Sequence, residues 1–213
     1  MTMIHQKLPT SPPGSTGLGG VLKKVGVITA LLASCAGPDA IAAGYQLVGG
    51  DFSLVASQSG DQISPALGFS KTGKGYIVWA ENTDGSGLGI GGQGYSSNGI
   101  RSGKNFRINT TVQDDQSSPS VAVFPDGSAF VAWQSGAPGD SAVFGRYITA
   151  NGVLQDEVRI SDAGKDVRTV SVAAAPQGGA IVVWSQLGGD ASEFGIVSRN
   201  IGPNGVPLGS PRQ

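Results

Sequence analysis

Three segments of the chain carry the same short apolar run, and each run ends on one of the three tryptophans. The runs are Tyr76–Trp79, Phe130–Trp133 and Ile181–Trp184. A strand-like run rich in Ala, Ser and Gly or Val precedes each of them, and Gly or Asp-Gly residues separate the two runs. Because these residues supply the positive φ of a tight reversal, each pair of runs predicts a β-hairpin.

Two further runs follow each tryptophan and complete a unit of about 50 residues. The third run of each unit leads to an Asn-Gly pair, in turn Asn98-Gly99, Asn151-Gly152 and Asn204-Gly205. Asn-Gly is a strong signal for a hairpin. The fourth run alternates apolar and polar residues at Phe106–Asn109 and Val158–Ser161, and Phe52–Val55 is its counterpart before the first unit. Each unit therefore predicts four antiparallel strands joined as a meander.

The order of polarity within the units favours a β-propeller. The predicted first strands are small, the second strands are fully apolar and the fourth strands are half polar. In a propeller the first strand lies nearest the crowded axis, the second is covered by blades on both sides, and the outermost is half solvated. A β-sandwich or a solenoid also has short strands, but a sandwich has no reason to repeat this order. We predict an all-β, propeller-like domain over residues 44–213, with three blades at about 56–109, 110–161 and 162–213.

The second unit reads Gln116-Ser-Ser-Pro119-Ser-Val-Ala-Val-Phe-Pro-Asp126-Gly127-Ser-Ala-Phe-Val-Ala-Trp133. It resembles the Gln-x-Ser-Pro-x-Val-Ala-x-x-x-Asp-Gly-x-x-Val-Val-Trp blades of large exported bacterial surface proteins. The first unit departs at Gly73, where Asp-Gly is expected, and the third lacks the Gln and Pro. The resemblance covers about residues 50–209 and implies the fold and export, and it carries no catalytic motif.

Three blades leave a ring to be closed, because propellers usually have about four to eight. The strand Phe52–Val55 precedes the first unit, and the third unit shows no evident fourth strand around Leu208–Ser210. One hypothesis is a homodimer in which each chain donates its first strand to the other, giving a six-bladed ring. The alternative is a piece of a longer propeller.

Residues 21–43 have the features of an export signal. Two lysines precede the apolar stretch Val25–Ala33, which has the length of a signal-peptide core and is short for a bilayer span. Leu32–Cys35 resembles the lipobox of bacterial lipoproteins, which predicts a lipid on Cys35, whereas Ala40–Ala42 resembles an ordinary cleavage site.

The segment before this signal, residues 1–20, has the composition of a linker and is expected to be a disordered leader. A start codon assigned too far upstream would also explain it. We therefore expect an exported protein, either a cell-envelope lipoprotein or a secreted one, that reaches the membrane only through its lipid anchor.

Composition excludes several classes of function. Fourteen basic and fifteen acidic residues leave a formal charge of -1, so no basic stripe exists for nucleic acid. The single histidine, His5, precedes the signal, and the single cysteine, Cys35, cannot form an internal disulfide. A mature domain without imidazole has no Ser-His-Asp machinery and no histidine-containing zinc site.

Strand direction places two kinds of connection on one face of the predicted disc. The connections between second and third strands contribute Asp84, Asp140 and Asp190. The connections between units contribute Asp61, Asp115 and Asp166. Because the tryptophan-terminated strands run toward the same face, Trp79, Trp133 and Trp184 join this candidate ligand-binding rim.

Indole faces beside carboxylates suit sugars, since rings stack on C–H surfaces and carboxylates accept hydroxyl hydrogen bonds. We therefore predict a binding, scaffold or adhesive module for a glycan or a surface protein, with calcium in the loop 82–87 as a weaker option and no other cofactor. The alternative is a purely structural piece, in which the tryptophans pack between blades and the aspartates shape turns.

Catalysis is not expected from the sequence. Glycoside hydrolysis needs two carboxylates about 5 to 10 Å apart. The three glutamates, Glu81, Glu157 and Glu193, occupy unlike positions in the units, so they single out no such pair. A glycosidase remains the enzymatic alternative.

Overall fold

The computed structural model describes residues 53–83, 85–190 and 193–213. The predicted leader, the export signal with Cys35, and Asp84 lie outside the described residues, and of residues 189 and 190 only the backbone is described. The described part contains no helix long and apolar enough to cross a membrane.

The described chain forms three separate four-stranded antiparallel sheets, each made of strands consecutive in sequence. The first sheet contains β1 (Gln62–Phe69), β2 (Gly75–Glu81), β3 (Gly89–Tyr95) and β4 (Arg101–Arg107). The second contains β5 (Gln116–Val123), β6 (Ala129–Ala137), β7 (Asp140–Ile148) and β8 (Leu154–Arg159). The third contains β9 (Val167–Ala174), β10 (Ala180–Asp190), β11 (Glu193–Ile201) and β12 (Pro207–Arg212).

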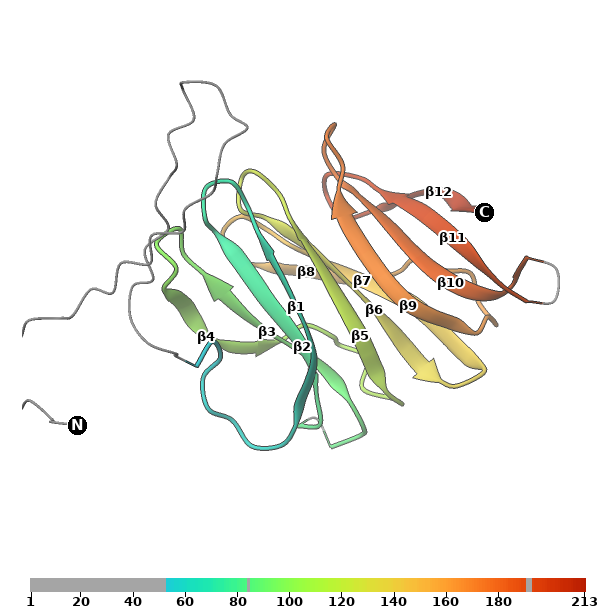
Figure 1. The fold of residues 1–213 in the computed structure, drawn as a ribbon, viewed down its shortest axis with the longest axis horizontal. Coiled ribbons are helices and arrows are strands. Elements are labelled where there is room, and N and C mark those ends of the chain that lie inside the picture. The colour runs from blue at the N-terminus through green and yellow to red at the C-terminus, as the bar shows by residue number, and fades with distance from the viewer. Residues whose placement is uncertain (1–52, 84, 191–192) are drawn as a thin grey trace, which may run out of the picture. The chain divides into compact units, whose positions relative to one another are not determined.

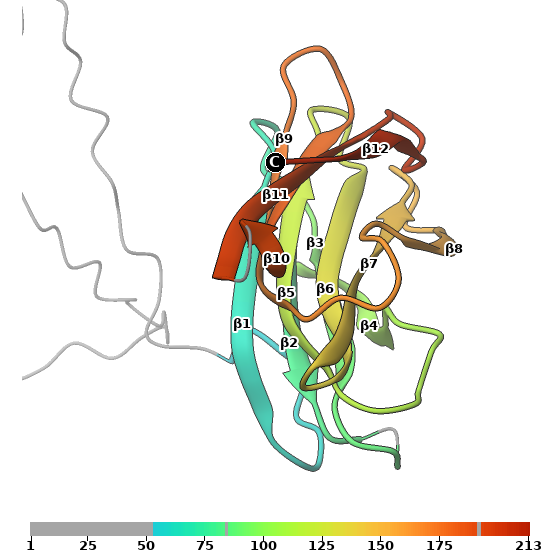
Figure 2. The same cartoon turned by 90° about the vertical axis from the view of Figure 1, so that its right-hand side faces the viewer.

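The sheets stand side by side in chain order, as Figures 1 and 2 show. Consecutive sheets touch through their first strands, β1 against β5 and β5 against β9, and each first strand also contacts the second strand of the preceding sheet. This arrangement confirms the predicted all-β, propeller-like fold with three meander blades.

The tryptophans fill the spaces beside the sheets, where indole buries a large area. Trp133 belongs to the apolar cluster between the first and second sheets, and Trp184 to the cluster between the second and third. Trp79 packs with Ile77 and Tyr95 on the opposite side of the first sheet, where Val55 covers them. Each indole thus points toward the preceding position in the array.

Every first strand carries an irregularity at the same point. The register with the second strand shifts there in all three sheets. Ser64, Ser118 and Thr169 have φ values of 52°, 51° and 54°, in the left-handed region that side chains rarely adopt. In the first two sheets this residue is the Ser of the repeated Ser-Pro pair, so the motif marks a β-bulge in the first strand.

The fourth strands begin earlier than the sequence pattern predicts. They directly follow the Asn-Gly turns, and Ile108 and Ile160 lie just beyond their ends. These residues still bond to the third strand of their own sheet, where the N–H of Ile108 donates to the carbonyl of Ile90 at 2.7 Å. Both isoleucines are fully buried. The predicted alternation of apolar and polar residues therefore covers the end of the fourth strand and the first residues of the connection to the next sheet.

The third sheet has its own fourth strand. β12 pairs with β11, so the prediction that this unit lacks a fourth strand is wrong. Residues 53–55 form no strand and instead lie against the first sheet, where the Tyr95 hydroxyl donates to the carbonyl of Leu54. An exchange of that segment is therefore not needed to complete any described sheet.

Candidate functional site

The predicted tryptophan residues lie in the interior. Trp79, Trp133 and Trp184 are only 2%, 0% and 1% exposed. The indole N–H of Trp79 donates to Glu81 at 2.5 Å, and that of Trp184 donates to Gln186 at 3.2 Å. No indole face is open to a ligand, because neighbouring sheets cover Trp133 and Trp184, and Val55 packs against the cluster that contains Trp79. The candidate binding surface therefore has to be sought elsewhere.

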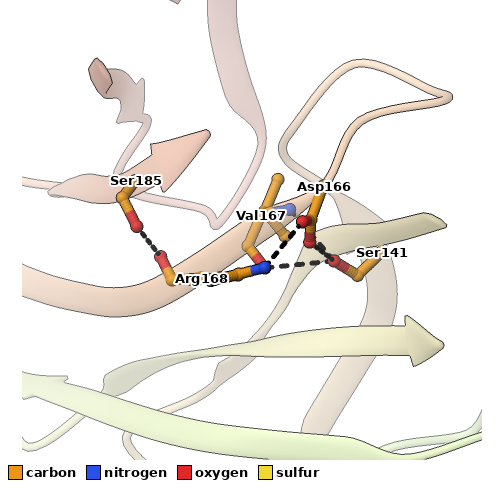
Figure 3. Close-up of polar contacts among 5 residues, drawn as sticks. All are labelled: Ser141, Asp166, Val167, Arg168 and Ser185. Carbon is orange, nitrogen blue, oxygen red and sulfur yellow. Dashed lines mark hydrogen bonds and ion pairs between the residues drawn. The ribbon is translucent and has the colours of Figure 1, made fainter. Parts of the chain in front are cut away.

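Two of the predicted rim aspartates connect neighbouring sheets. Asp115, just before β5, accepts a hydrogen bond at 3.0 Å from the N–H of Leu88 in the β2–β3 connection of the first sheet. Asp166, just before β9, faces Ser141 at the start of β7, with a long contact of 3.5 Å between Ser141 Oγ and Asp166 Oδ1 (Figure 3). The same serine Oγ accepts from the N–H of Val167 at 3.0 Å. These equivalent contacts join each sheet to the next one.

Asp166 is also paired with a charge. Its Oδ2 lies 3.0 Å from Arg168 Nη2, and the carboxylate is 7% exposed (Figure 3). Its backbone carbonyl accepts from the N–H of Leu187 at 2.9 Å. Arg168 and Leu187 both belong to the third sheet, so among these partners only Ser141 connects the Asp166 carboxylate to the second sheet.

The remaining rim residues do not form a common site. Asp61 is exposed before β1, where its backbone N–H donates to Asn82 Oδ1 at 2.9 Å, and Asp140 is exposed in the tight β6–β7 turn. Asp84 and the side chain of Asp190 lie outside the described residues. Within the described ranges no group of three His, Cys, Asp or Glu side chains is placed to hold a metal ion. Calcium in the loop 82–87 therefore stays a prediction.

A hollow of about 660 Å³ lies at the opposite ends of the sheets, where the hairpins between first and second strands come together. We call it the hairpin cavity. All three sheets contribute to it, through Phe69 to Lys71, through Val123 to Asp126 with Ser128 and Tyr147, and through Ala174 to Pro176 with Gly178, Gly179 and Pro203. Most of its lining surface is apolar.

Aromatic rings and prolines form the apolar part of the hairpin cavity. Phe69 is 47% exposed, and Tyr147 is half-buried beside the buried Phe124, with the two ring centres 6.1 Å apart. Pro125 and Pro176 occupy the hairpin turns of the second and third sheets. A rigid apolar surface of this kind is open to a ligand without any side chain having to move out of a packed core.

Asp126 supplies a fixed negative charge at this cavity. Its Oδ1 accepts hydrogen bonds from the N–H of Ser128 at 2.9 Å and from the hydroxyl of the same serine at 2.6 Å. These bonds lower the pKa of Asp126 below its ordinary value, with a smaller contribution from Lys74. The carboxylate is therefore ionised at neutral pH and held in one orientation. Lys71 and Ser70 also line the cavity.

Sequence reasoning missed this cavity because it treated the hairpins only as turns. One signal was present: prolines and aromatic residues flank the turns, as in Phe124-Pro125-Asp126. The turn itself does not need these proline and aromatic residues, because Gly127 with φ 86° already supplies its geometry.

No protein-family model matches the chain, and no curated protein matches it by sequence. Among solved structures, an endo-1,4-beta-xylanase from Bacteroides thetaiotaomicron is similar at 13% identity and TM-score 0.48, over 72% of this chain and 60% of that one. An alpha-L-arabinofuranosidase from Lactobacillus brevis is similar at 13% identity and TM-score 0.46, over 71% and 57%. A thermostable family-43 glycoside hydrolase is similar at 15% identity and TM-score 0.44, over 75% and 64%. The chain thus spans less than two thirds of each structure.

These comparisons correct one expectation. We predicted from the sequence that the chain is not an enzyme, and the prediction is contradicted because the similar structures just named are all glycoside hydrolases. The description of the protein as non-catalytic is therefore dropped. The fold defines a propeller-like protein, and the activity of each neighbour remains a property of that neighbour.

Proposed function

We propose that this protein is an exported, propeller-like protein of the bacterial cell envelope that binds carbohydrate in the hairpin cavity. The observation that carries the proposal is the combination of exposed aromatic surface and an oriented carboxylate in one hollow. Phe69 and Tyr147 border this hollow together with Asp126.

The chemistry of sugars matches this lining. One face of a pyranose ring presents C–H groups, which pack on aromatic rings and on the carbon surface of proline. The hydroxyl groups at the edge of the sugar need acceptors, and the ionised Asp126 provides one whose position is fixed by Ser128. The Tyr147 hydroxyl and Ser70 add further polar groups at the border.

Export is supported by residues 21–43 and by the resemblance of the units to blades of exported surface proteins. A lipid anchor on Cys35 would hold the described sheets at the envelope. Labelling of growing cells with palmitate tests the anchor: we expect label on the wild-type chain and none on the Cys35→Ser variant. Equal labelling of both chains would contradict a lipid at this position.

The binding proposal is tested on a glycan array with the purified chain, in the presence and absence of calcium. We expect specific glycans to bind, and we expect Phe69→Ala and Asp126→Asn to weaken that binding by at least about 10-fold, since each removes one contact type. Ile100→Ala is the control, because Ile100 is an exposed apolar side chain, at 61%, outside the cavity. This control should bind as the wild type does.

The same glycans are then incubated with the protein and examined for released reducing ends, so that binding and cleavage are measured separately. The proposal is overturned if no glycan on the array binds specifically. So would a glycan whose binding is unaffected by both cavity variants.

A further inference from the structure

A second hollow, of about 380 Å³, lies between the first and second sheets. It shares no lining residue with the hairpin cavity. The first sheet contributes residues of β2, β3 and β4, and the second contributes Gly127 of the β5–β6 turn and residues 150–152 of the β7–β8 turn. We call it the lysine pocket, after its lining residues Lys74 and Lys104. Its volume lies in the range of about 300 to 1,000 Å³ that is usual for pockets that hold small molecules.

A glycine on the third strand leaves the space for the lysine pocket. In the strand pairing, Gly94 on β3 is equivalent to Tyr147 on β7. Tyr147 packs against the third sheet, where a Cβ built on Gly205 would lie 2.5 Å from Tyr147 Cβ. Gly152 is the residue equivalent to Gly205 in the second sheet, and a Cβ built on it would meet nothing within 4 Å. The junction between the first and second sheets is therefore open where the next junction is filled.

The described lining of this pocket carries positive charge and no carboxylate. Neither Lys74 nor Lys104 forms an ion pair with another described residue. A Cβ built on Gly127 would lie 2.5 Å from Lys74 Cδ, so the side chain of Lys74 reaches from the first sheet to the turn of the second. Lys74 contributes a little to the lowered pKa of Asp126, but hydrogen bonds from Ser128 hold that carboxylate in the hairpin cavity. The two ammonium groups thus have no anionic partner in the pocket.

Tyr76 adds a hydrogen-bond donor that the described protein does not use. Its side chain lines the pocket and is only 8% exposed, yet its hydroxyl has no hydrogen-bond partner among the described residues. Tyr95 in the same lining differs, because its hydroxyl donates to the carbonyl of Leu54. Burial raises the pKa of Tyr76, so its hydroxyl keeps its proton at neutral pH. Since polar groups in such places normally have a partner, this hydroxyl marks a position for an acceptor atom of a ligand.

We propose that the lysine pocket binds a small molecule that carries an anionic group, either a carboxylate or a phosphate. Two ammonium groups and a hydroxyl border the pocket as donors to the oxygens of such a group, and hydrogen bonds to charged partners are the strong ones. Phe106, whose ring centre lies 6.4 Å from that of Tyr76, adds an apolar surface for the carbon skeleton of the ligand. The proposal does not depend on carbohydrate binding in the hairpin cavity.

Isothermal titration calorimetry on the purified chain tests the proposal. The probes are inorganic phosphate, glucose 6-phosphate and glucuronate, with glucose as the neutral comparison. We expect at least one anionic probe to bind at one site per chain. Binding of inorganic phosphate would identify a phosphate as the preferred anion, and binding of glucuronate alone would identify a carboxylate.

Four variants locate the bound anion. Lys74→Gln and Lys104→Gln should each weaken its binding by about 10-fold, since each removes a charged donor. Tyr76→Phe should weaken it by a similar factor and leave the thermal midpoint of the free protein unchanged, because the hydroxyl has no partner there. Gly94→Tyr places in the pocket the ring that the second sheet has at Tyr147, and it should abolish binding without a change of charge.

Lys165→Gln is the matched control, because it removes the same charge from a lysine that lines neither hollow. This variant should bind the anion as the wild type does, and circular dichroism confirms that each variant is folded. The proposal is overturned if no anionic probe binds, if binding survives both variants of the pocket lysines, or if these variants weaken glucose binding equally. It is also overturned if Lys165→Gln weakens anion binding as much as they do, since that result would show a general attraction to positive charge.

Discussion

Glycine at the centre of the third strand permits the close packing of the second sheet, and Gly145 is the position where this can be measured. A Cβ built on Gly145 would lie 2.6 Å from Phe130 Cζ and 2.8 Å from Ile160 Cδ1. Both neighbours are 0% exposed, so neither side chain can rotate into solvent. The backbone of Gly145 is not in the left-handed region, so the substitution Gly145→Ala tests packing alone.

The expected cost follows from the chemistry of overpacking. Inserting one methyl group into a close-packed core typically costs about 1 to 3 kcal/mol, because neighbouring side chains leave their preferred rotamers. For a chain of this size that loss lowers the thermal midpoint by about 2 to 12 °C. Equilibrium unfolding in urea measures it directly, as a lower midpoint concentration with an unchanged slope.

Ser198 in the third sheet is the matched control. It occupies the place equivalent to Gly145, but no further sheet covers it in the described structure. Ser198→Ala should therefore change stability by less than about 0.5 kcal/mol. In the double variant, Phe130→Leu should recover part of the loss caused by Gly145→Ala. A Gly145→Ala variant as stable as the wild type would refute the packing described for this sheet.

Three further predictions concern single residues. Thr169 is a β-branched residue at φ 54°, so Thr169→Asn should raise the free energy of unfolding by about 0.5 to 1 kcal/mol in urea titrations; no gain would contradict a strained bulge. The buried indole N–H of Trp133 has no acceptor among the described residues, whereas its counterpart Trp184 in the third sheet donates to Gln186. Ser135→Gln should therefore raise the free energy of unfolding by about 1 kcal/mol. A lower free energy of unfolding would show that the longer side chain does not reach the indole. Hydrogen bonds from Ser128 lower the pKa of Asp126 in the folded protein. The stabilisation they give is complete above the ordinary pKa of 3.8 and is lost as the pH falls through the lower pKa of the folded state. The difference in free energy of unfolding between the wild type and Ser128→Ala should therefore become smaller on acidification, and a difference independent of pH would contradict this.

The repeat, the strand order and the hairpins could be read from the sequence because they depend on short-range pairing. A tight turn such as Phe124–Ser128 needs a residue with positive φ at one place, and Gly127 provides it locally. An apolar run such as Ile181–Trp184 has to be buried in some sheet whatever the rest of the chain does. These requirements act within one unit, and the unit occurs three times.

The hairpin cavity and the contacts of the predicted rim aspartates depend on how the sheets stack. The sequence pattern treats Asp115 and Asp166 as surface acids, yet both reach into the junction with the preceding sheet. The hairpin cavity exists only because turns from all three sheets meet.

The exposed fractions of equivalent residues also depend on how the sheets stack. Val143 and Ile196 are equivalent in the repeat. Among the described residues a neighbouring sheet covers Val143, which is 0% exposed, and none covers Ile196, which is 68% exposed. The sequence by itself determined what each blade is made of, since backbone pairing and turn geometry are local. Tertiary structure alone decided which faces of the blades are buried, because burial comes from contacts between residues far apart in the chain.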